Sequence, residues 1–176
     1  MSDELDAIIR SSLAAFARDV LDSAWWGKEH DWVSRYAFNY LINLCSPEGP
    51  LRHPGQIAIE VGVAQPPGMY KAGAVGRDLV IWSKPGSSCW DRDWKPSNHP
   101  IAVLEWKVHR QGHRNRRQAH EREWLKRYTE WQPSTVAYAV EINLGKNPST
   151  LKCARFLAGS SDDLWLELKG SGRSAG

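Results

Sequence analysis

Apolar residues recur at helical spacing in two segments near the N-terminus and in one later segment. A helix is predicted at 3–24, where the apolar positions form a single stripe. A second is predicted at 29–44, followed by the helix-ending run Ser46-Pro47-Glu48-Gly49-Pro50. The third, at 115–131, is stopped by the Gln132-Pro133-Ser134 segment.

Other segments have the alternating or β-branched composition of strands. Strands are predicted at 57–64, 76–82, 101–108, 135–143, 152–157 and 164–168. The clearest alternation is in 57–64. There, one face is expected to carry Ile57, Ile59, Val61 and Val63, with Ala58, Glu60 and Gly62 on the opposite face.

This order of elements predicts one α/β (α+β) domain at 1–169, with a central mixed β-sheet flanked by helices. A run of strands followed by a crossover helix and another strand requires both antiparallel and parallel pairing. The predicted parts are an N-terminal helix at 1–26, a core at 29–144 and C-terminal strands at 150–169. A disordered tail is predicted at 170–176.

Charged side chains interrupt two of the predicted strands. Glu105 and Lys107 lie two residues apart in 101–108, so both point to the same face. Ionised groups in a buried strand are costly unless they are paired or bind a metal. Asp78 opens the preceding strand and can meet Glu105 at one hard cation such as magnesium. The alternatives are a turn role for Asp78 and an exposed, salt-bridged strand for the other two.

The arrangement of Asp78 on one strand and Glu105-Trp106-Lys107 on the next resembles the PD-(D/E)XK nuclease superfamily, which has the restriction-endonuclease-like fold. The resemblance covers roughly 29–144 and implies an αβββαβ core, here with an extra N-terminal helix. Arg77 departs from the proline that often precedes the aspartate in that family.

The resemblance also implies an activity. The expected activity is that of a magnesium-dependent nuclease, with Mn²⁺ as a substitute ion. Such an enzyme would cleave DNA in preference to RNA and would act as an endonuclease that leaves 5′-phosphate ends. Asp78, Glu105 and the carbonyl of Trp106 would hold the metal, and Lys107 would orient the attacking water or neutralise charge. A nuclease-fold module that binds nucleic acid or a partner protein without catalysis is the alternative.

Two further carboxylates are candidate site residues. Glu60 could be another metal ligand or an ordinary surface carboxylate. Glu29, at the start of the second helix, could point at the metal site or favour the helix N-terminus electrostatically. Asp31 replaces Glu29 if that helix is rotated.

Positive charge is concentrated directly after the candidate site. The segment 107–127 holds eight Lys/Arg against two Glu, a local formal charge of +6 in a chain of net +3. A solvated helix face and a surface for a polyanion are both consistent with it. The candidate phosphate contacts are Arg110, Arg114, Arg117, Gln118 and Arg122. Trp90 and Trp94, in the loop 83–100, could stack on bases or fix that loop to the domain.

Composition narrows the class of protein without identifying it. The 176 residues suit one domain, and no apolar run is long enough to span a bilayer, so no membrane role is expected. Three widely spaced cysteines fit neither a disulfide framework nor a zinc cluster, and a cytoplasmic setting is predicted. Sequence specificity would come from loops, from a homodimer or from a partner subunit.

Overall fold

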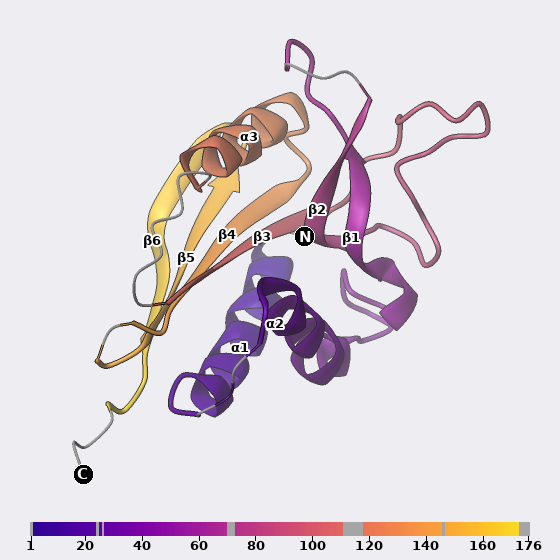
Figure 1. Cartoon of the computed structure of the whole chain (residues 1–176). Helices are drawn as coiled ribbons and strands as arrows, with labels where there is room; N and C mark the ends of the chain where they lie inside the picture. Colours follow the sequence, from indigo (N-terminus) through magenta and orange to yellow (C-terminus); the bar gives the residue numbers. More distant parts are fainter. Residues whose placement is uncertain are drawn as a thin grey trace.

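Among the described residues, a sheet of six strands lies between helices, and Figure 1 shows this arrangement. The computed structural model of the chain describes residues 2–23, 25, 27–69, 73–110, 118–145 and 147–172. Within this part, helices α1 (Ser2–Val20) and α2 (Glu29–Tyr36) cover one face of the sheet, and α3 (Gln118–Trp131) covers the other. The prediction of an α/β (α+β) fold with a mixed sheet flanked by helices is confirmed.

The strands follow the chain order across the sheet, β1-β2-β3-β4-β5-β6. Their bounds are β1 (Ile57–Ala64), β2 (Ala74–Ile81), β3 (Ala102–His109), β4 (Val136–Asn143), β5 (Thr150–Leu157) and β6 (Ser160–Lys169). Of these six described strands, only β3 and β4 pair in parallel, and α3 makes the crossover that a parallel pair needs. The order α2-β1-β2-β3-α3-β4 is the order that the sequence predicts.

Local signals explain where the element boundaries match the predictions and where they differ. α2 continues through a π-helical turn (Ala37–Leu41) and a 3₁₀ turn (Ile42–Leu44), so the predicted helical stretch 29–44 is confirmed. The hairpin β5–β6 is longer than predicted, because β6 begins with exposed polar residues that show no alternation. Its turn uses Ala158 and Gly159, both with positive φ (47° and 76°), as tight hairpin turns require.

The predicted faces of β1 are wrong at its centre. Ile57 and Ile59 pack in the core under α1 and α2, whereas Val61 and Val63 pack in the core under α3. Between the two pairs, Glu60 has a left-handed backbone with φ 52°. A residue in this conformation interrupts the extended backbone, so the alternation of side chains changes phase there.

The C-terminal end stays hydrogen-bonded beyond β6. The N–H of Gly170 donates to the carbonyl of Ser149 at 2.9 Å, and the N–H and hydroxyl of Ser171 donate to the Asp22 carboxylate. These contacts extend two residues into the predicted tail 170–176, of which 173–176 lie outside the described residues. Among the described helices, none combines the length and the apolar character that crossing a membrane requires.

Candidate active site

Strands β2 and β3 are paired at one end only. Their register joins Leu79 to Leu104, Val80 to Val103 and Ile81 to Ala102, whereas β3 pairs with β4 along all of Ala102–His109. The candidate site lies where β2 separates from β3. We call this place the fork. It is bordered by Arg77 and Asp78 on β2 and by Glu105–Val108 on β3.

Carboxylates take the place of the missing strand partner along the free edge of β3. The backbone N–H of Trp106 donates to Asp78 Oδ2 at 2.7 Å, and that of Val108 donates to Glu29 Oε2 at 3.1 Å. In a strand, the N–H and the C=O of one residue point to the same side. The Trp106 carbonyl, the predicted metal ligand, therefore faces the fork as well.

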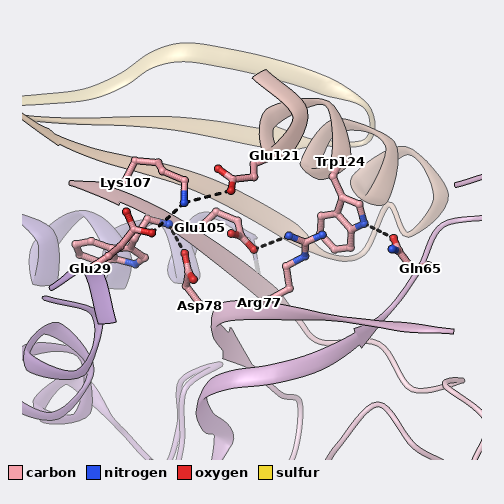
Figure 2. A network of polar contacts seen from close by, with 9 residues as sticks. Glu29, Gln65, Arg77, Asp78, Glu105, Lys107, Glu121 and Trp124 are labelled. Carbon is pink, nitrogen blue, oxygen red and sulfur yellow. Dashed lines mark hydrogen bonds and ion pairs between the residues drawn. The ribbon is translucent and has the colours of Figure 1, made fainter. Parts of the chain in front are cut away.

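Lys107 joins the two helical layers at this edge (Figure 2). Its Nζ lies 3.0 Å from Glu29 Oε1 on α2 and 3.2 Å from Glu121 Oε1 on α3, with only 12% of the side chain exposed. Burial lowers the pKa of Lys107, but the bonds and charges of Glu29 and Glu121 outweigh it and leave the pKa raised. The ammonium is therefore a fixed positive charge at the fork.

Glu105 is held by an arginine from the opposite strand. Its Oε1 accepts a hydrogen bond from Arg77 Nη1 at 3.0 Å, and the two side chains are 7% and 8% exposed. The Arg77 guanidinium lies 3.5 Å from the ring centroid of Trp124, on α3. Trp124 in turn donates from Nε1 to Gln65 Oε1 at 2.6 Å.

The fork concentrates negative charge in a poorly solvated place. Four carboxylates (Glu29, Asp78, Glu105 and Glu121) face two cations (Arg77 and Lys107), so four minus two leaves a formal charge of −2. Burial raises the pKa of Glu105 to about 8; the Arg77 charge opposes this rise and the Asp78 charge adds to it.

The neighbouring acids respond in the same direction. Burial raises the pKa of Asp78, against the opposing Trp106 N–H and Lys107, and a hydrogen bond between the Asp78 and Glu105 carboxyls lowers it in part. The pKa of Glu121 is also raised, first by burial. Such a cluster favours an added cation.

The donor set of the fork fits a hard divalent ion of the magnesium type. Asp78 and Glu105 supply carboxylate oxygens from neighbouring strands, and the Trp106 carbonyl faces the same edge. Magnesium is commonly held by one or two carboxylates with water and substrate phosphate completing its shell. Among the described residues, no group of three or more His, Cys, Asp or Glu is arranged to hold a metal. The candidate set is therefore two carboxylates and a carbonyl rather than a full side-chain cage.

One additional acidic candidate, Glu29, contacts the fork, and the other, Glu60, lines a pocket beside Asp78. Glu29 is the first residue of α2, and its carboxylate contacts Lys107 Nζ and the Val108 N–H on the β3 edge. Asp31 instead accepts the Lys28 N–H at 2.7 Å, as a cap of α2. Glu60 is exposed and lines a small pocket together with Asp78 and residues of α2. Its left-handed backbone is a conformation that costs about 1–3 kcal/mol, and such strain often gathers at functional sites.

The predicted phosphate contacts are only partly within the described structure. Arg122 forms an ion pair with Asp163 on β6, so in this conformation its guanidinium is not part of the fork network. Arg110 follows directly after β3. Arg114, Arg117 and the side chain of Gln118 lie outside the described residues, and their roles stay predictions.

The loop 83–100 presents one tryptophan to solvent. Trp94 is 79% exposed and has φ 59°, whereas Trp90 is 39% exposed and bridges to Pro96. The Asp91 carboxylate accepts the N–H groups of Asp93 and Lys95, each at 2.9 Å, and so fixes the turn that carries Trp94. Trp94 does not fix the loop to the domain, and the base-stacking interpretation remains for it.

Sequence reasoning missed two residues of the fork. Arg77 entered only as a departure from the family pattern, and Glu121 only as one of two acids in a basic segment. A signal for Arg77 existed: a buried arginine in an apolar strand requires a carboxylate partner. Glu121 carried a similar signal, because its spacing from Trp124, Leu125 and Tyr128 places it on the apolar face of the predicted helix.

The fork as a whole combines a candidate cation site with a fixed ammonium at the unpaired edge of β3. That combination suits the hydrolysis of phosphate esters, since a divalent cation and a neighbouring ammonium both stabilise charge on phosphoryl oxygens. Searches of protein-family models, curated proteins and solved structures found no match to this chain.

Proposed function

We propose that this protein is a magnesium-dependent nuclease of the restriction-endonuclease-like fold that hydrolyses DNA phosphodiester bonds, acting as an endonuclease. One observation carries the proposal: Asp78 and Glu105 lie side by side with Lys107 at the unpaired edge of β3. With all four carboxylates ionised, the fork has a formal charge of −2, which one divalent cation neutralises.

Asp78, Glu105 and the Trp106 carbonyl would hold Mg²⁺, with Mn²⁺ as a substitute. When bound, such an ion polarises a phosphoryl oxygen and lowers the pKa of a coordinated water. Lys107 would place its ammonium beside the scissile phosphate, where it stabilises developing negative charge or orients the water. Glu29 and Glu121 would position Lys107 by holding its Nζ from α2 and α3.

A polyanionic substrate agrees with the distribution of charge around the fork. The segment 107–127, with its local formal charge of +6, begins at Lys107 and leads into α3. A basic surface of this kind contacts phosphates without reading sequence. DNA is the substrate that we favour.

The test is a cleavage assay on plasmid DNA with Mg²⁺, with Mn²⁺ and with a chelator. We expect nicking or linearisation only with metal, and its loss in the Lys107→Ala variant. Lys152→Ala is the matched control, because Lys152 also lies on a strand and pairs with a carboxylate, Glu167 at 3.4 Å, but is outside the fork. Cleavage that persists in Lys107→Ala, or that ignores the chelator, would refute the proposal.

A second candidate is a non-catalytic module that binds nucleic acid or a partner protein. The observation in its favour is that the charged groups of the fork already have protein partners: Arg77 for Glu105, Glu29 and Glu121 for Lys107, and the Trp106 N–H for Asp78. DNA binding that is equal with and without metal, together with no cleavage under any condition, would favour this candidate.

A further inference from the structure

Arg77 is a charged side chain that the proposed reaction does not use directly. Only 8% of its surface is exposed to solvent. The guanidinium lies between two partners, the Glu105 carboxylate at 3.0 Å and the Trp124 ring at 3.5 Å. The Arg77 Nε is also buried and has no hydrogen-bond partner among the described residues. Burying a guanidinium in this way is expensive, since one of its donors is left unsatisfied.

Stability alone does not explain this arrangement. A buried ion pair is often no more stabilising than apolar side chains of similar volume, because both ions lose their hydration. An apolar residue at position 77 could pack against Trp124 equally well. What only an arginine supplies here is a directed donor to one oxygen of Glu105 from a fixed position.

The partner of Arg77 on α3 is itself held in place. Trp124 is fixed at one side by the hydrogen bond from its Nε1 to Gln65, at 2.6 Å. On the other side it stacks with Tyr128, with ring centroids 4.7 Å apart and an interplanar angle of 19°. The guanidinium therefore lies on a rigid aromatic surface (Figure 2).

We propose that Arg77 is a positioning residue of the metal site, which holds one oxygen of Glu105 so that the carboxylate faces Asp78 and the cation. The inference rests on the proposed function. It also assigns a role to Trp124, which keeps the guanidinium in place through the cation–π contact. Groups that orient a ligating carboxylate from outside commonly change metal affinity by about 10–100-fold when they are removed.

The experiment measures Mn²⁺ binding by titration calorimetry on the full chain without DNA, so that it does not depend on cleavage. We expect Arg77→Met to weaken Mn²⁺ binding by about 10–100-fold. Arg77→Lys should weaken it less, because it keeps the charge but not the planar donor. Trp124→Phe should have a smaller effect in the same direction, since it keeps a ring but loses the bond to Gln65.

The matched control is Arg155→Met, which removes a half-buried arginine from its pair with Asp6 at 2.7 Å, two strands from β3. It should leave Mn²⁺ affinity unchanged. Thermal melts identify any variant that has lost its fold, and the milder Arg77→Lys and Trp124→Phe variants then decide. Unchanged Mn²⁺ affinity in all three fork variants overturns the proposal. Tighter binding overturns it too, because Arg77 would then be a competitor of the ion. Absence of Mn²⁺ binding by the wild-type protein overturns the proposed function itself.

Discussion

Strand β3 has two different edges. One is paired along the whole strand and supports the fold, and the other borders the charged groups of the fork. On one edge β4 pairs with β3 along the whole strand, and on the other β2 pairs with it at only three positions. Where β2 is paired, the neighbouring side chains are apolar and buried, as at Leu79 and Leu104. Where β2 has separated, carboxylates accept the N–H groups that a strand would have accepted.

The difference shows how a sheet can carry charge inside a domain. An unpaired strand edge offers backbone donors that must be satisfied when buried. Asp78 and Glu29 satisfy them, and in doing so they bring two acids close to Glu105 and Lys107. The paired end of β2 and β3 then acts as the support, while the fork holds groups that would be costly elsewhere. Changes at the two ends should accordingly have different consequences.

The largest expected effect is on cleavage at the fork. Asp78→Asn removes a proposed metal ligand but keeps an oxygen that can accept the Trp106 N–H, so the strand geometry is preserved. Plasmid cleavage with Mg²⁺ should fall by more than about 100-fold, beyond the loss typical of a group outside the coordination shell. Because burial raises the pKa of Asp78, its charge is unfavourable in the folded state, and the stability of the variant should be unchanged or slightly higher. Cleavage within a few-fold of wild type would contradict the assignment.

At the paired end of β2 and β3, a substitution should lower stability and leave metal binding nearly unchanged. Leu104 is fully buried and pairs with Leu79, so Leu104→Ala leaves a cavity in the core. The free energy of unfolding, measured with urea, should fall by about 2–5 kcal/mol. Mn²⁺ affinity measured well below the unfolding transition should stay close to wild type. Comparable destabilisation by Asp78→Asn and Leu104→Ala would remove the distinction between the two ends.

The contrast also explains how much could be predicted from the sequence. Regular elements follow from short-range periodicity, and strand β1 at 57–64 and the helical stretch 29–44 were predicted with their observed bounds. The shared face of Glu105 and Lys107 followed from the period of a strand. The fork did not follow, because it depends on where β2 leaves β3, which alternation does not encode. The contacts of Arg77 and Glu121 depend on how α3 lies over the sheet.

A pH titration of stability probes the buried charge at the fork. The folded-state pKa of Glu105 is raised to about 8, above its unfolded value of 4.5. A group with a raised pKa contributes stability that is fully present below the unfolded pKa and is lost as pH rises through the folded pKa. With a chelator present, the melting temperature should therefore fall between pH 5 and pH 9, by at least about 2–4 °C if the loss reaches 1 kcal/mol.

The Glu105→Gln variant should flatten this dependence, because the amide does not titrate. Glu167→Gln, on the exposed side of β6, serves as the control and should keep the wild-type slope. A wild-type melting temperature that rises from pH 5 to pH 9 would contradict this prediction, and would mean that Arg77 holds Glu105 ionised throughout, so that the fork carries its full formal charge of −2.

The smallest expected effect lies outside the fork, at the loop between its two strands. Trp94 is 79% exposed, so Trp94→Ala should leave the melting temperature unchanged. If the ring stacks on a base, the affinity for single-stranded DNA should fall by about 5-fold or more, as the loss of about 1 kcal/mol or more implies. Leu164→Ala is the control, because Leu164 is 68% exposed on β6 and cannot stack. Fluorescence anisotropy with a labelled oligonucleotide gives both affinities.

An unchanged affinity for Trp94→Ala would confine the interaction with DNA to the fork and its basic flank. A loss of affinity in Trp94→Ala but not in Leu164→Ala would extend that interaction to the loop 83–100, which joins the paired end of β2 to β3.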